Sequence, residues 1–120
     1  TLKEIAIITI ARQYTAQYEW HVHARRAKVV GVDDATIDAI RHRRRPKFND
    51  AEEALIYDMT LEMVEQRRLG DDLYASAIET FGNAAVVELV ALIGFYVMIA
   101  VFLVSFEVPV PDPDAVLLVD

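Results

Sequence analysis

The sequence predicts an all-α fold, a single-domain bundle of about six helices with a proline-rich C-terminal tail. Apolar residues recur at helical spacings in successive segments, and capping residues or glycines separate these segments. No segment shows the alternation of apolar and polar residues that marks a half-buried strand. The chain has 120 residues, a length typical of one domain, so 1–120 is predicted to be one unit.

Two helices are predicted in the first quarter of the chain. Apolar spacing predicts a helix over about 2–13, and a break near Tyr14 follows. Thr15 is suited to cap a second helix over about 16–30. This helix is expected to end at Gly31, because glycine readily adopts the left-handed conformation that often follows a helix.

The middle of the chain predicts two further helices. The pair Asp33–Asp34 begins a short third helix, which ends before Pro46. Asn49 or Asp50 caps a fourth helix, and the acidic residues that follow suit the positive end of the helix dipole. This fourth helix is expected to end near Gly70.

The last third predicts two helices and the tail. A fifth helix over about 72–81 ends at Gly82, and Asn83 then caps a sixth over about 84–105. From Glu107 onward prolines occupy alternate positions, so the tail cannot be helical.

The sixth helix is long and apolar enough to cross a bilayer. Within 84–104 only Glu88 is charged, but no Lys or Arg flanks the segment to orient it in a membrane. We therefore predict a central buried helix, packed on all sides in an oligomer, and keep a membrane span as the alternative. The hydrophobic share of 54% also indicates extra burial at a subunit interface.

Charge is unevenly distributed along the chain. Residues 1–70 contain all 12 basic residues and 11 acids, whereas residues 71–120 contain 8 acids and no base. With a net charge of -7, the chain is not expected to be a general nucleic-acid binder. The basic run over 41–47 is interpreted mainly as a solvated loop at a helix end, with an interface, substrate-entry or nucleic-acid role as alternatives.

The chain contains no cysteine, which excludes disulfides, thiolate nucleophiles, cysteine-ligated zinc and iron–sulfur clusters. It opens at Thr1 without Met, and helix is predicted from Leu2, so we expect a natural N-terminal segment to be missing or processed. The start lacks the features of a signal peptide. A cytoplasmic location is the default expectation.

Glu19 and His23 form the strongest local motif. They stand four residues apart, so both lie on one face of the second helix. A carboxylate beside an imidazole can fix its tautomer and allow proton transfer near neutral pH. If the first two helices pack as a hairpin, Glu4 can meet His23 from across. The alternative is a solvated Glu–His pair on the surface, with Glu4 exposed as well.

Metal and cofactor sites are not predicted. His21 stands two residues from His23 and cannot converge with it on one helix face, and no third ligand joins Glu19 and His23. No nucleophile elbow or glycine-rich phosphate loop is present. Tyr96 follows Gly94, which would allow a close helix crossing, and a buried phenol is either a core or a pocket-lining group.

Taken together, these residues resemble the carboxymuconolactone decarboxylase family and its AhpD-like relatives. The resemblance begins in the string 3–11, continues through Glu19 and His23, and includes Gly31 with the acidic helix start after it. It extends to the segments 94–96 and 106–111, and so covers nearly the whole chain.

The resemblance also separates two branches of the family. In the peroxidase branch a Cys-x-x-Cys pair precedes the histidine, and those positions correspond here to Ala16 and Glu19, with Glu4 at a proton-relay glutamate. Peroxidase activity is therefore not expected. The decarboxylase branch has a glutamate four residues before the histidine, as here, but its Pro-x-Glu-Leu pattern is replaced by Gln17-Tyr-Glu-Trp20, which changes the pocket wall.

The resemblance implies a cofactor-free lyase of aromatic-compound catabolism that assembles as a homo-oligomer, a dimer, trimer or hexamer. It would remove CO2 from a small anionic lactone or keto acid, with His23 as general acid oriented by Glu19 or Glu4. Arg12 is the candidate cation for the substrate. Trp20 and Tyr96 are candidate pocket residues. The alternatives are a non-catalytic oligomer that binds a small ligand, and nucleic-acid binding through 41–47.

Overall fold

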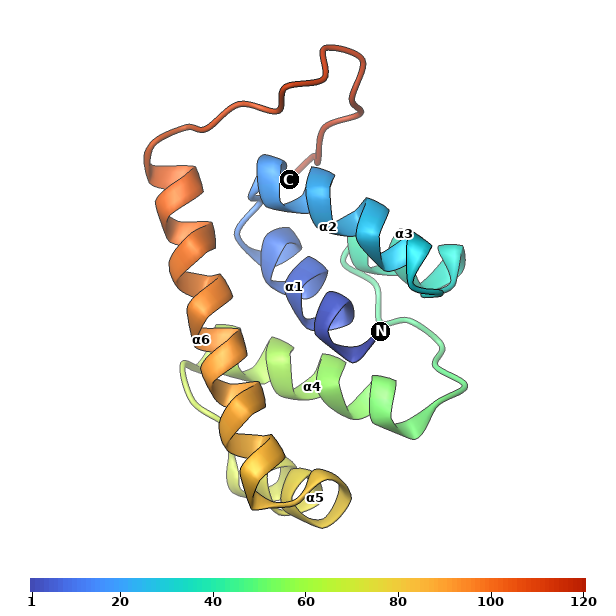
Figure 1. The fold of residues 1–120 in the computed structure, drawn as a ribbon, viewed down its shortest axis with the longest axis vertical. Helices are drawn as coiled ribbons and strands as arrows, with labels where there is room; N and C mark the ends of the chain where they lie inside the picture. The colour runs from blue at the N-terminus through green and yellow to red at the C-terminus, as the bar shows by residue number, and fades with distance from the viewer.

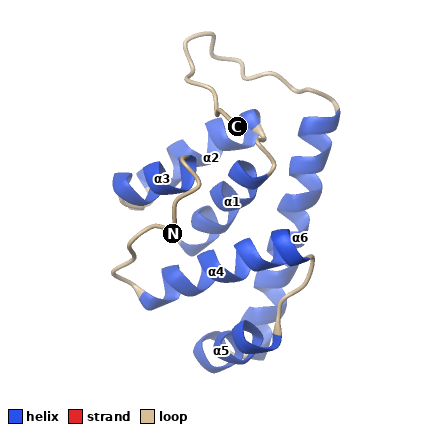
Figure 2. Cartoon of the chain, turned by 180° about the vertical axis from the view of Figure 1, so that it is seen from behind, coloured by secondary structure: helices blue, strands red, loops and turns tan.

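The computed structural model describes all residues 1–120 and contains six α-helices and no strand (Figures 1 and 2). The predicted all-α bundle is confirmed. In chain order the helices are α1 Leu2–Gln13, α2 Gln17–Val29, α3 Asp34–Arg41, α4 Ala51–Gln66, α5 Asp71–Phe81 and α6 Asn83–Ser105.

Helix α1 occupies the centre of the molecule. All nine residues from Glu4 to Arg12 are buried, because α2, α3, α4 and α6 pack around it (Figure 1). Its run of isoleucines and alanines presents apolar side chains in every direction, as a helix surrounded by others requires. A glutamate and an arginine at the ends of this buried segment must therefore find partners within the protein.

Helix α6 has nearly the predicted bounds, but within the single chain it is not the central helix, so the prediction that it lies at the centre is wrong. Its fully buried residues, Val86, Ile93 and Ala100, are spaced seven apart and form one narrow stripe. Most of its other side chains are partly or fully exposed, although α6 is long and apolar enough to cross a membrane by length and composition. The physical reason is that α1 already fills the centre, which leaves α6 on the outside of the bundle (Figure 1). Burial of α6 in an oligomer remains a prediction.

Two of the predicted helix ends are confirmed. Gly31 adopts a φ of 98° directly after α2, a conformation that favours glycine. Asp50 caps α4, where its side chain accepts hydrogen bonds from the backbone N–H groups of Glu52 and Glu53.

Three other predicted ends are wrong in detail. Thr15 does not cap α2, because it has a φ of 49° and the N-cap residue is Ala16. Helix α4 ends at Gln66, since Arg67 turns left-handed with a φ of 63°. Asn83 is the first residue of α6 and Gly82 precedes it as the cap.

The C-terminal tail is non-helical, as predicted, and folds back onto the start of the chain. Beyond α6 it arches over the molecule and ends beside α2 (Figure 1). Leu118 is buried there, and its backbone pairs with Gln17: the Gln17 Nε2 donates to the Leu118 carbonyl at 3.0 Å, and the Leu118 N–H donates to Gln17 Oε1 at 2.8 Å. We call residues 116–120 the C-terminal strap.

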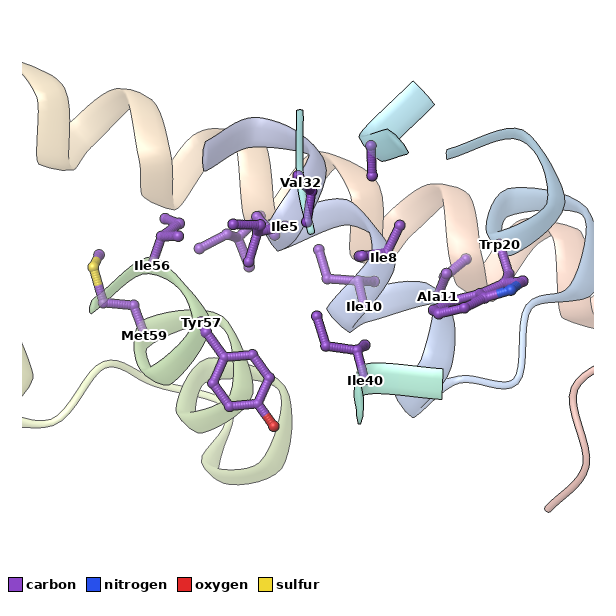
Figure 3. Packing of buried hydrophobic residues seen from close by; sticks show 14 of the residues in the cluster. Ile5, Ile8, Ile10, Ala11, Trp20, Val32, Ile40, Ile56, Tyr57 and Met59 are labelled. Atoms are coloured by element: carbon purple, nitrogen blue, oxygen red, sulfur yellow. The ribbon is translucent and has the colours of Figure 1, made fainter. Parts of the chain in front are cut away.

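The core is one connected cluster of 18 buried apolar residues centred on α1 (Figure 3). Ile5 of α1 lies near Val32 of the α2–α3 connection and Ile56 of α4, and Trp20 of α2 lies beside Ala11 at the other end of the cluster (Figure 3).

Truncation of a central isoleucine tests this arrangement. Ile8 is fully buried, so Ile8→Ala should lower the free energy of unfolding by about 2–5 kcal/mol in urea denaturation. The matched control is Val29→Ala at the exposed end of α2, where a change within about 0.5 kcal/mol is expected. Equal effects of the two substitutions would contradict a central position for α1.

Candidate functional site

Glu4 and His23 meet between α1 and α2, as the hairpin model predicted. The distance between His23 Nδ1 and Glu4 Oε2 is 2.8 Å, and both side chains are about nine-tenths buried. An ionised carboxylate only accepts hydrogen bonds, so opposite such a Glu4 the imidazole donates from Nδ1. This contact orients the ring and leaves Nε2 as the nitrogen that can exchange a proton with another group.

Tyr96 of α6 packs against the histidine. The Tyr96 ring stands edge-on to the His23 ring, with 5.5 Å between centroids and an interplanar angle of 80°. The arrangement fits the preference of aromatic pairs for T-shaped contact. Three predicted site residues, Glu4, His23 and Tyr96, thus come together from three helices, α1, α2 and α6.

Glu19 is buried on α2 one turn before His23, but it does not pair with it. Only 2% of Glu19 is exposed, and neither carboxylate oxygen has a hydrogen-bond partner in the protein. Burial raises the pKa of Glu19 to about 8, because a low-dielectric environment disfavours the charged form. Glu19 is therefore a neutral carboxylic acid at pH 7, and Glu4 rather than Glu19 orients the histidine.

Arg12 lies at the opposite end of α1 from Glu4. Eight residues separate them, which is about 12 Å along the helix axis. Arg12 is 1% exposed, and its Nη2 donates to the Val119 carbonyl at 2.6 Å. Burial, followed by the nearby charge of Arg43, lowers the pKa of Arg12, and Asp120 opposes this effect. Arg12 thus belongs to the contact with the C-terminal strap.

Trp20 lies one turn before the histidine on α2, but it faces a different part of the molecule and lines a hollow that His23 does not reach. It is buried, and the guanidinium of Arg41 lies 5.9 Å from its ring centroid. Trp20 and Arg41 line a hollow of about 310 Å³ between α2 and the tail, which His21 also borders. The structure therefore separates Trp20 from the Glu4–His23 pair.

Arginines of the basic run 41–47 also have partners within the chain. Arg44 pairs with Asp38 at 3.0 Å, and Arg45 pairs with Asp58 at 2.9 Å. Arg41 donates to carbonyls of the strap. The run thus connects α3 to neighbouring segments, and residues 42–45 and Lys47 are exposed, as expected of a solvated loop at a helix end.

The Glu4–His23 pair is closed off from the main surface hollows. These five hollows have volumes of about 250–570 Å³, and none is lined by Glu4, Glu19, His23 or Tyr96. The chain also holds no cluster of three or more His, Asp or Glu side chains placed to bind one metal ion. The pair thus lies in the packed interior between α1, α2 and α6.

Sequence reasoning missed the polar residues that bind the strap. Thr15, Gln17 and Arg41 all contact residues 116–120. These contacts join positions 75–105 residues apart in the chain, and periodicity carries no signal for such pairs.

Comparison with known proteins gives no match: no protein-family model, no curated protein and no solved structure is significantly similar to the chain.

The buried Glu19 predicts a pH-dependent stability. In the folded protein Glu19 keeps its proton up to about pH 8, because burial raises its pKa, whereas in the unfolded chain it releases the proton near its ordinary pKa of 4.5. Folding therefore binds a proton between these values, and stability should fall as pH rises through this window, by on the order of 3–5 kcal/mol in all. Glutamine has the shape of a protonated glutamic acid but does not titrate. Glu19→Gln should therefore remove this dependence of the free energy of unfolding on pH, and the variant should be more stable than the wild type above pH 8.

Urea unfolding from pH 5 to 9 measures the effect. Glu79→Gln, at an exposed position on α5, is the matched control and should keep the wild-type slope. A Glu19→Gln variant with an unchanged slope would show that Glu19 is solvated in solution.

Proposed function

We propose that the chain is a divergent member of the carboxymuconolactone decarboxylase family and a cofactor-free lyase acting on a small anionic lactone or keto acid. The observation that carries the proposal is the buried Glu4–His23 pair at 2.8 Å, with the neutral acid Glu19 one helical turn away. The all-helical fold agrees with the family resemblance. Protonation of a carbon atom requires a proton donor held in position, and a general acid–base pair next to a protonated carboxyl group can supply it.

The reaction needs one proton and no redox step. The bond between the α-carbon and the carboxylate carbon breaks, CO2 leaves, and the electron pair stays on the substrate. A conjugated carbonyl spreads this charge as an enolate or dienolate. A proton from the protein then forms the new C–H bond, so that a carboxylate and a proton become CO2 and the protonated product.

His23 is the proposed proton donor, and Glu4 is its positioning partner. Contact with Glu4 at Nδ1 leaves Nε2 to deliver the proton. Glu19 has a pKa of about 8, so its neutral carboxyl group can donate a hydrogen bond to the developing enolate oxygen. Tyr96, which packs against the ring of His23, keeps the imidazole in place.

We also propose that copies of the chain associate through the outer face of α6. This face carries several exposed large apolar side chains, and exposed patches of this kind mark interaction sites. They are Val87, Val90, Phe95, Met98, Val101 and Phe102. A second copy is favoured over a bilayer because no Lys or Arg follows Arg68 in the chain. Association at this face would cover the seam between α2 and α6 beside Tyr96.

The decarboxylation assay tests the proposed reaction. CO2 release would be measured from carboxymuconolactone and from related lactone and keto acids. His23→Ala should lower kcat by about 10²–10⁴-fold, because the proton donor is lost. Glu4→Gln should cause a smaller loss, since the imidazole remains but is no longer oriented by a carboxylate.

The matched control is His21→Ala, which removes a half-buried histidine from another face of the same helix and should keep full activity. Full activity of His23→Ala would exclude histidine as the donor. A wild type that is thermally stabilised by such acids but releases no CO2 would support the ligand-binding alternative.

Self-association is tested at Gly94, which lies exposed on α6. A Cβ added there meets no atom within 4 Å, so Gly94→Leu is tolerated by the single chain but would obstruct a close helix crossing between copies. We expect the variant to have a lower mass than the wild type in sedimentation equilibrium. Ser76→Leu, on the exposed side of α5, should leave the mass unchanged. A monomeric wild type that partitions into lipid vesicles would favour the membrane alternative.

A further inference from the structure

A second polar site lies at the end of α1 remote from the Glu4–His23 pair. A cleft of about 390 Å³ is bordered by three arginines, Arg12, Arg41 and Arg43, together with His42. Residues of the C-terminal strap form its other wall. Three guanidinium groups that converge on one cleft create a positive potential in an otherwise acidic protein.

Arg12 is the buried member of this cluster and lacks sufficient partners. Its Nη2 donates to the Val119 carbonyl, but Nε and Nη1 have no hydrogen-bond partner in the protein. A guanidinium presents five donors and is costly to bury without an anion. The nearest acid is Asp120, whose Oδ1 lies 3.8 Å from Arg12 Nη2, too far for a hydrogen bond. Arg12 therefore has the capacity to bind a better-placed anion.

The carboxylate of Asp120 shows which chemistry the cleft recognises. Its Oδ1 accepts a hydrogen bond from Thr15 Oγ1 at 2.6 Å and lies 3.8 Å from both Arg12 and Arg43. Yet 83% of the Asp120 side chain is exposed. A carboxylate at the mouth of the cleft is thus held by one hydroxyl and two distant arginines, an arrangement that a free ligand can improve.

The strap is attached by contacts that can be exchanged. Apart from buried Leu118, it is held by polar contacts, among them the hydrogen bonds from Arg41 to the carbonyls of Val116 and Leu117 at 2.8 and 3.2 Å and the bond from Thr15 to Asp120. A small anion that enters the cleft can take over the arginine donors, because each guanidinium can bind a carboxylate through two parallel hydrogen bonds.

We propose that Arg12, Arg41 and Arg43 form a binding site for a small carboxylic acid, which the chain's own Asp120 partly occupies in this structure. Ligand and strap compete for the same arginines, so binding releases residues 116–120. The site is separate from the Glu4–His23 pair and does not depend on the proposed lyase reaction.

The single tryptophan reports on this site. Trp20 lies beneath Arg41 and beside the strap residues Val116 and Leu117, and it is the only Trp in the chain. Its fluorescence is therefore expected to change when the arginine and the strap move. Succinate is the carboxylate probe, inorganic phosphate tests other oxyanions, and sodium chloride at matched ionic strength controls for screening.

Asp120→Asn removes the competing charge. We expect the variant to bind succinate about tenfold more tightly than the wild type, equivalent to ~1.4 kcal/mol. The matched control is Asp114→Asn, which alters an exposed aspartate of the same tail and should bind like the wild type. Arg43→Gln changes an exposed arginine without touching the core, and should weaken binding at least several-fold in a folded protein.

Three results would overturn the proposal. The first is no saturable response to succinate in either the wild type or Asp120→Asn. The second is an equal fluorescence response to sodium chloride, which would show that the response to succinate is only ionic screening. The third is equal affinity of Asp120→Asn and Asp114→Asn, which would make Asp120 a structural anchor only. Phosphate binding as tight as that of succinate would overturn the assignment to carboxylic acids.

Discussion

The burial of α1 on every side is the constraint on which the rest of the structure depends. A helix with isoleucine and alanine on all faces is stable only when other helices enclose it. Helices α2, α3, α4 and α6 supply that enclosure. The same enclosure removes Glu4 and Arg12 from water. Since neither charge can be buried without compensation, each end of α1 requires a dedicated polar partner.

The buried charges at the two ends of α1 are compensated in different ways, and the two ends are therefore suited to different chemistry. At one end Glu4 meets an imidazole, a group that exchanges protons near neutral pH. At the other end Arg12 meets one backbone carbonyl and a distant carboxylate, and its free donors suit it to bind an anion. Glu19 avoids a buried charge in a third way. Burial raises its pKa to about 8, which favours the neutral form of its carboxyl group at pH 7.

The sequence predicted most of the fold because that information is local. Helical spacing, the Asp50 cap and Gly31 each act within a few residues. The contact of Glu4 with His23 was one of two possibilities that the sequence left open, and the packing of α1 against α2 decides between them. The isolation of Glu19 was not predictable, because spacing identifies a shared helix face but not what covers it. The position of α6 and the docking of the strap depend on packing across the whole chain, for which a single sequence carries no periodic signal.

The strap makes the surroundings of Arg12 depend on a segment far along the chain. Helices α1, α2 and α3 are synthesised before α4, α6 and the strap that complete their surroundings. Arg12 receives its carbonyl partner only when Val119 arrives, more than a hundred residues later. Until Val119 has been synthesised, the nascent chain carries Arg12 without this carbonyl partner.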